Sequence, residues 1–130
     1  MVMPYVDALT TWDIDFGKEL WRVLRTSKSF PAQGVLWLLE SENGWRLLVA
    51  TPRVDEVGRQ KAYEQLANAT RGVVPGANQP LRIELISPKE PLYQALRSVF
   101  AKTASVEGAR LGNTQVGGMY IEDAYLYEVR

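Results

Sequence analysis

Cysteine and histidine are both absent from this 130-residue sequence, and each absence excludes a class of chemistry. Without cysteine there can be no disulfide, no thiolate nucleophile and no zinc or iron–sulfur site with sulfur ligands. Without histidine, Ser-His-Asp hydrolysis and imidazole-ligated metals are excluded, because the side chain that titrates nearest neutral pH is missing. An enzyme would have to use carboxylates, Tyr, Lys, Arg, hydroxyls or the backbone. We identify no catalytic residue and expect neither a cofactor nor a metal.

Net charge and long apolar runs are absent as well. The 15 basic and 15 acidic residues cancel, which argues against a nucleic-acid partner. The longest apolar run, 35–39, is far shorter than the roughly 20 residues that span a bilayer, and the first residues lack the pattern of a signal peptide. We therefore expect a cytoplasmic protein that has no membrane partner. The length predicts a single globular domain over residues 1–130.

Periodicity and turn residues predict three helices and five strands. The helices are expected at 10–29, 59–71 and 91–104, where apolar residues recur at the helical spacing. The strands are expected at 34–40, 45–51, 81–86, 106–111 and 119–129, with an Asn-Gly turn between the first two. The order α-β-β-α-β-α-β-β predicts an α+β fold with three helices and a mixed sheet of about five strands.

One face of this sheet is expected to need additional cover. If the helices at 59–71 and 91–104 lie on the same face, Ile83 and Leu85 pack beneath them and the opposite face is partly apolar and partly charged. Such a face needs cover from the first helix, from a second copy of the chain or from a ligand. Together with the three tyrosines of 119–129, this pattern predicts self-association as a homodimer.

The most unusual local stretch is 51–59, where a strand end, a tight turn and a helix start meet. Open α/β sheets tend to bind ligands at strand ends, and free N–H groups at a helix start bind anions. The alternative is structural: Asp55 caps the turn, and the aliphatic part of the Arg59 side chain packs over the core. The candidate binding residues for a small anionic ligand are Arg53, Asp55, Arg59, Tyr63 and Glu84.

Two further patterns have ordinary explanations. Lys18, Arg22 and Arg25 form a basic stripe beside Trp21 that could contact phosphates, and a solvated helix face explains the stripe equally well. The glycine-rich segment 112–118 precedes a strand rather than a helix. This favours a hairpin loop with a bulge over a phosphate-binding loop.

The run 45–58, continued by Ala62 and Tyr63, resembles a family of small bacterial hypothetical proteins of the type found in mobile gene cassettes. The resemblance covers about the middle third of the chain and implies no activity. From the residues themselves we predict a non-catalytic binding or interaction module that self-associates. The alternative is a histidine-free enzyme or a small-anion-binding protein, with a pocket at the junction of the second strand and second helix.

Overall fold

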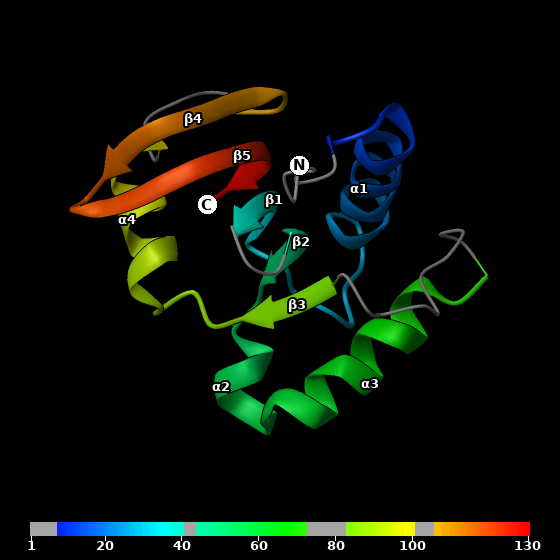
Figure 1. Ribbon diagram of the computed structural model, residues 1–130. Helices are drawn as coiled ribbons and strands as arrows, with labels where there is room; N and C mark the ends of the chain where they lie inside the picture. The colour runs from blue at the N-terminus through cyan, green and yellow to red at the C-terminus, as the bar shows by residue number, and fades with distance from the viewer. Residues whose placement is uncertain (1–7, 41–43, 73–82, 101–105) are drawn as a thin grey trace.

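The computed structural model describes residues 8–40, 44–72, 83–100 and 106–130, and it contains a five-stranded mixed sheet with helices on both faces (Figure 1). The strands are β1 (Gly34–Glu40), β2 (Gly44–Ala50), β3 (Ile83–Ile86), β4 (Ala109–Val116) and β5 (Met119–Val129). The helices are α1 (Thr11–Leu24), α2 (Arg53–Val57), α3 (Arg59–Thr70) and α4 (Pro91–Phe100). The predicted α+β class is confirmed.

The strands lie in the order β3-β2-β1-β5-β4, so β3 and β4 form the two edges of the sheet. β2 and β3 are parallel, and the other neighbouring strands are antiparallel. β1 lies in the centre because its first five residues, Gly34 and four apolar residues, are buried on both faces. The predicted Asn-Gly turn includes residues 41–43, which lie outside the described ranges. Residues 81–82 of the predicted third strand and residues 101–104 of the predicted third helix also lie outside them.

The described ranges contain four helices, one more than the sequence predicts. The additional helix is α2, a five-residue segment at the start of the predicted ligand site. Gly58 separates α2 from α3 because its φ of 89° lies in a region that L side chains rarely adopt. α3 then begins at Arg59, the residue that the sequence predicts.

A reciprocal pair of hydrogen bonds begins α1. Thr10 Oγ1 accepts a bond from Asp13 N at 3.1 Å, and Asp13 Oδ2 accepts one from Thr10 N at 3.0 Å. This capping box satisfies two backbone donors that the first helical turn would otherwise leave without partners. The helix ends at Leu24, five residues before the predicted end at 29, and its buried side includes Leu20 and Trp21.

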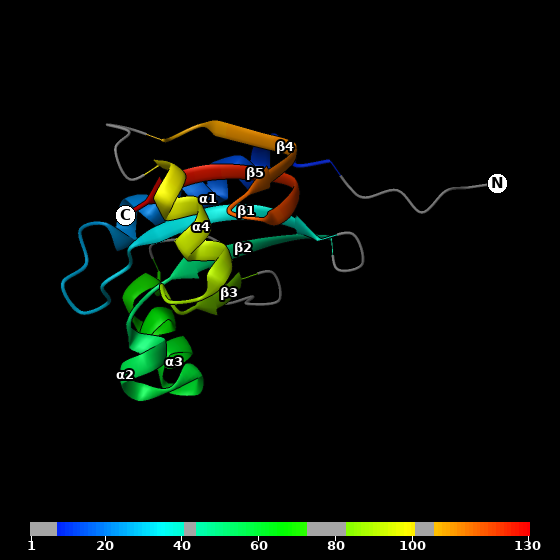
Figure 2. The same ribbon diagram turned by 90° about the vertical axis from the view of Figure 1, so that its left-hand side faces the viewer.

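The two faces of the sheet have separate apolar cores. α1 and α3 cover the first face, whose core includes Leu20, Leu24, Val35, Trp37, Leu47, Val49, Ala62, Leu66, Ile83, Leu85 and Tyr127. α4 covers the second face, whose core includes Leu36, Leu38, Leu48, Ala50, Ile86, Tyr93, Leu96 and Leu126. Figure 2 views the second face, with α4 crossing in front of the sheet and α1 behind it.

This arrangement differs from the expectation that the second and third predicted helices share one face. α3 and α4 lie on opposite faces, and the second face is covered by α4 rather than by α1. The physical reason is that α1 and α3 already cover the first face, so the second face is the apolar surface that remains for Tyr93 and Leu96. Because described helices pack against both faces of the sheet, the expectation that a second copy covers an exposed face no longer has support.

Candidate functional site

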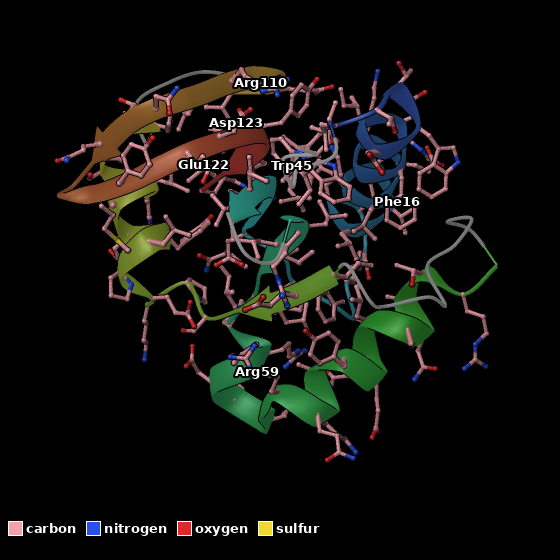
Figure 3. The ribbon with its side chains drawn as sticks, in the orientation of Figure 1. Phe16, Trp45, Arg59, Arg110, Glu122 and Asp123 are labelled. Carbon is pink, nitrogen blue, oxygen red and sulfur yellow. The ribbon has the colours of Figure 1, made fainter. Side chains whose placement is uncertain are left out.

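Two of the candidate ligand-binding residues, Arg59 and Tyr63, lie along the outer edge of β3 (Figure 3 labels Arg59). The hydroxyl of Tyr63 accepts a hydrogen bond from Leu85 N at 3.0 Å and donates one to Ile83 O at 3.2 Å. Arg59 Nη1 donates to Leu85 O. An edge strand carries N–H and C=O groups that can pair with another chain. The two α3 side chains therefore satisfy this edge in place of a neighbouring strand.

The candidate residues of α2 also have partners. Arg53 Nη1 pairs with Glu56 Oε1 at 2.8 Å on the surface. Asp55 Oδ2 accepts a hydrogen bond from Ser87 Oγ at 2.6 Å, which ties α2 to the segment that follows β3. Asp55 does not cap the helix, because α2 has no side-chain cap bond. Its interaction is tertiary, with a residue 32 positions later in the chain.

The fifth candidate, Glu84, faces the other side of the sheet. Side chains alternate along a strand, so Glu84 points away from the first-face core that Ile83 and Leu85 enter. Its Oε1 lies 2.7 Å from Arg46 Nε. The structure thus gathers Asp55, Arg59 and Tyr63 along β3 and separates Glu84 from them by the sheet. A small-anion site at this junction stays a prediction.

The opposite edge of the sheet is different in character. β4 has eight residues, is exposed at half of its positions, and contains neither Lys nor Pro. Within the described ranges, its backbone bonds to β5 and, at its first residue, to Val106, and no strand lies on its outer side. The sequence predicts a strand that ends at 111 and a loop over 112–118. The strand instead continues to Val116, because Gly117 and Gly118, both with positive φ, make the tight turn.

The direction of the β4 side chains changes at the centre of the strand. Ala109 and Leu111 contact the second-face core before the centre, and Val116 does so after it, so the inward positions change from odd to even numbers. Asn113 lies at the change and has a φ of 46°. Its Oδ1 accepts a hydrogen bond of 2.5 Å from Tyr120 Oη across the hairpin.

Arg110 is the charged residue of β4, and it forms an ion pair within the hairpin while its side chain stays 49% exposed. Its Nε and Nη2 each lie 2.9 Å from one carboxylate oxygen of Asp123, which is the paired geometry that arginine and carboxylate favour. The guanidinium also lies 5.6 Å from the ring centroid of Trp45. The hydrogen bond to Asp123 raises the pKa of Arg110 above its ordinary value. Figure 3 shows the two partners side by side on β4 and β5.

The sequence pattern does not reveal this pair, because the two residues are 13 positions apart and become neighbours only in the β4–β5 register. The available signal was an arginine and an aspartate on two strands joined by a glycine turn. Two large apolar side chains stay exposed next to the turn: Met119 is 36% exposed and Tyr120 is 60% exposed.

Two buried tyrosines have shifted pKa values and structural roles. The hydroxyl of Tyr93 donates to Arg130 O at 2.9 Å, and burial raises its pKa to about 12. The hydroxyl of Tyr127 donates to Ile14 O at 2.6 Å, and burial raises its pKa also. Both shifts move the pKa away from neutral pH. The two hydroxyls therefore stay protonated and join α4 and α1 to neighbouring segments.

In the part of the chain that the structure describes, no three acidic side chains gather in a group that could hold a metal ion. None of the helices in that part is long and apolar enough to cross a membrane.

Comparisons with other proteins place no known function on this fold. No family model matches the sequence, and searches of the curated proteins and of the solved structures return no similar protein. The resemblance to gene-cassette proteins therefore stays a prediction.

Proposed function

We propose that this chain is a non-catalytic interaction module of the cytoplasm, and that it forms a homodimer by pairing the β4 strands of two copies. The observation that carries the proposal is the difference between the two sheet edges. Arg59 and Tyr63 occupy the edge of β3, whereas no strand lies on the outer side of β4 in the described ranges. An exposed edge strand of this length is a template for a further strand.

The burial pattern of β4 supports pairing with a second copy of itself. Read from either end towards the centre, the strand alternates between partly or fully buried and exposed positions in the same order. Residues that face each other across a strand pair must point to the same side of the sheet. An antiparallel pair centred between Gly112 and Asn113 meets this condition. The facing residues of the two copies would be Ala109 with Val116, Arg110 with Gln115, and Leu111 with Thr114.

Charge also supports this pairing. The whole chain has no net charge, so two copies do not repel each other at long range. In the proposed register Arg110 faces the neutral Gln115 of the second copy rather than another arginine. Tyr120 faces Gln115 within the hairpin, so its exposed ring would lie in the same row of side chains. Tyrosine and methionine are enriched in protein interfaces, which fits the exposure of Tyr120 and Met119 beside the turn.

The polar contacts of the fold support a non-catalytic role. Two acids that a histidine-free enzyme could use are engaged in structural interactions: Asp55 with Ser87, and Asp123 with Arg110. The shifted pKa of Tyr93 lies further from neutral pH than that of a free tyrosine. General acid–base catalysis instead requires groups that titrate near the working pH.

The experiment measures molar mass by size-exclusion chromatography with light scattering over a concentration series. We expect a mass near twice the 14.6 kDa of one chain at high micromolar concentration. Gln115→Lys places a second positive charge opposite Arg110 at two symmetric positions, and Gln115→Glu places a negative charge there. Facing charge pairs contribute about 0.2–1 kcal/mol each. The dissociation constant should therefore rise several-fold in the lysine variant and fall in the glutamate variant.

Gln60→Lys, on the exposed side of α3, is the matched control for an added charge and should leave the mass unchanged. A wild-type chain that stays monomeric at high micromolar concentration contradicts the proposal. A dimer whose dissociation constant is the same in both Gln115 variants contradicts pairing through β4.

A further inference from the structure

The strand β5 changes its side-chain direction at the same level as β4. The register of the hairpin places Glu122 opposite Asn113, where the change in β4 occurs (Figure 3 labels Glu122). Ile121 contacts the second-face core before this point, and Ala124 contacts it after this point. Residues three positions apart point to opposite sides of a regular strand, so the inward positions of β5 change from odd to even numbers as well.

This agreement between neighbouring strands has a physical reason. Residues that face each other across a strand pair must point to the same side of the sheet. A strand that alternates regularly would match the directions of β4 only on one side of the change, over four of its eight residues. A strand with the same change at the same level would match all eight. Irregularities of this kind at a sheet edge oppose pairing with regular strands.

The backbone of Asn113 produces the change in β4. Its φ of 46° lies in the left-handed region, which asparagine adopts more readily than most residues with a side chain. Glycine aside, Asn113 is the one residue with a positive φ in the part of the chain that the structure describes. The hydrogen bond from Tyr120 Oη to Asn113 Oδ1 holds its side chain across the hairpin.

A second copy of β4 carries the change that the outer side of β4 requires. β5 carries a matching change too, but it lies between β1 and β4, so both of its sides are occupied. When two copies of β4 run antiparallel, Gly112 of each lies opposite Asn113 of the other. The two changes then coincide, and side-chain directions agree along the whole strand.

We infer that the change at Asn113 makes the β4 edge selective, so that it pairs with β4 of a second copy in a single register and not with a regular strand. This inference rests on the proposed β4 dimer and makes Asn113 a positioning residue for it. A regular edge strand can slip by two residues, because such a slip keeps every side chain on its own side of the sheet. In β4 the same slip would separate the two changes.

The test measures register by disulfide cross-linking, because the chain has no cysteine of its own. Chains with Thr114→Cys are mixed with chains with Leu111→Cys, which face each other in the proposed register, and oxidised glutathione is added. A second mixture combines Thr114→Cys with Ala109→Cys, which face each other only after a two-residue slip. In the proposed register that second pair is displaced by about 7 Å along the strands. A disulfide requires Cα atoms within about 7 Å in total.

The first mixture should give cross-linked dimers, and the second should give no more than each variant gives alone. In each variant alone, the two copies of the cysteine are displaced by at least about 10 Å along the strands. All three positions are half-buried and point to the same side of the sheet, so they are matched in accessibility.

The role of Asn113 is tested in the background of the first mixture. Asn113→Val should lower its cross-linking to the level of the second mixture, because a β-branched residue disfavours a positive φ. Asn113→Gly loses the bond to Tyr120 but keeps access to a positive φ, so it should keep the cross-linking. Asn68→Val, at an exposed position of α3, is the matched control and should change nothing.

The inference is overturned if the two mixtures cross-link equally, because the register is then not fixed, and this result does not depend on whether Asn113→Val folds. It is also overturned if Asn113→Val, shown by a thermal melt to be folded, cross-links as the parent does. A wild-type chain that stays at 14.6 kDa, with neither mixture cross-linked, removes the dimer and the inference together. A wild-type dimer with equal yields removes the inference alone.

Discussion

Replacing Tyr63 by phenylalanine removes one hydroxyl from the edge of β3 and keeps the aromatic ring. That hydroxyl accepts a hydrogen bond from Leu85 N and donates one to Ile83 O, so the substitution breaks two bonds at once. Arg59 still donates to Leu85 O in the variant, and the strand keeps one of its three edge contacts. The variant therefore tests the two hydrogen bonds at the β3 edge while the packing of the aromatic ring is kept.

The expected loss follows from the burial of these groups. A typical hydrogen bond contributes about 0.5–1.5 kcal/mol net to stability. Tyr63 is partly exposed, so water can replace part of what is lost, and we expect a decrease in unfolding free energy of about 1–2 kcal/mol. For a chain of this length such a decrease lowers Tm by roughly 4–8 °C.

The assay combines thermal unfolding with amide hydrogen exchange. Tyr120→Phe is the matched control, because its exposed hydroxyl makes a single bond to a side chain, and its Tm should change little. In Tyr63→Phe the amide of Leu85 should exchange faster, since its edge acceptor is gone. An unchanged Tm together with unchanged protection of Leu85 would show that α3 does not satisfy this edge.

Three more outcomes are expected. Gly17→Ala should lower the unfolding free energy measured in urea by about 1–3 kcal/mol, because the new Cβ would lie 2.6 Å from the Cζ atom of Tyr127. An increase in unfolding free energy would contradict this close approach. The pKa of Tyr93 is raised to about 12 in the folded chain, so on raising the pH the unfolded chain loses this proton first. The contribution of Tyr93 to the unfolding free energy should therefore be fully present below about pH 10 and decrease by about 2 kcal/mol as the pH rises through 12. Urea unfolding at several alkaline pH values should show a shallower fall for Tyr93→Phe, and an equally steep fall would refute the assignment. Asp55→Ala and Ser87→Ala should each lower the unfolding free energy by about 1 kcal/mol, and the double variant should lower it by little more than either single variant. Additive decreases in the double variant would show that the two side chains do not interact.

The helices and strands were predictable where local signals decide them. The helix spacing of α3 and the conformational freedom of Gly58 are properties of a few adjacent residues, and α3 begins at the predicted residue. α2 escaped prediction because a five-residue helix is too short to show a periodicity. β4 was predicted too short because the glycines of 112–118 suggested a loop, whereas only Gly117 and Gly118 form the turn.

The candidate site was less predictable, because it depends on which segments meet. The sequence pattern at Arg59 and Tyr63 is compatible with side chains that bind a ligand and with side chains that bond to the backbone of an edge strand. Only the position of β3 beside α3 shows that they bond to the strand. Glu84 could be assigned to the face opposite Ile83 from alternation alone. Its partner Arg46 could not, because that pair depends on the parallel register of β2 and β3.

By itself the sequence determined the α+β class, the number of strands and the exclusion of cysteine and histidine chemistry. These follow from composition and from periodicities that each short segment carries alone. The tertiary structure decided the strand order and the placement of α4 on the second face. It also decided the contrast between the β3 edge, whose backbone bonds to Tyr63, and the β4 edge, which no strand covers within the described ranges. These depend on pairing between residues far apart in the chain, where many arrangements satisfy the same local pattern and the packing of whole faces selects one.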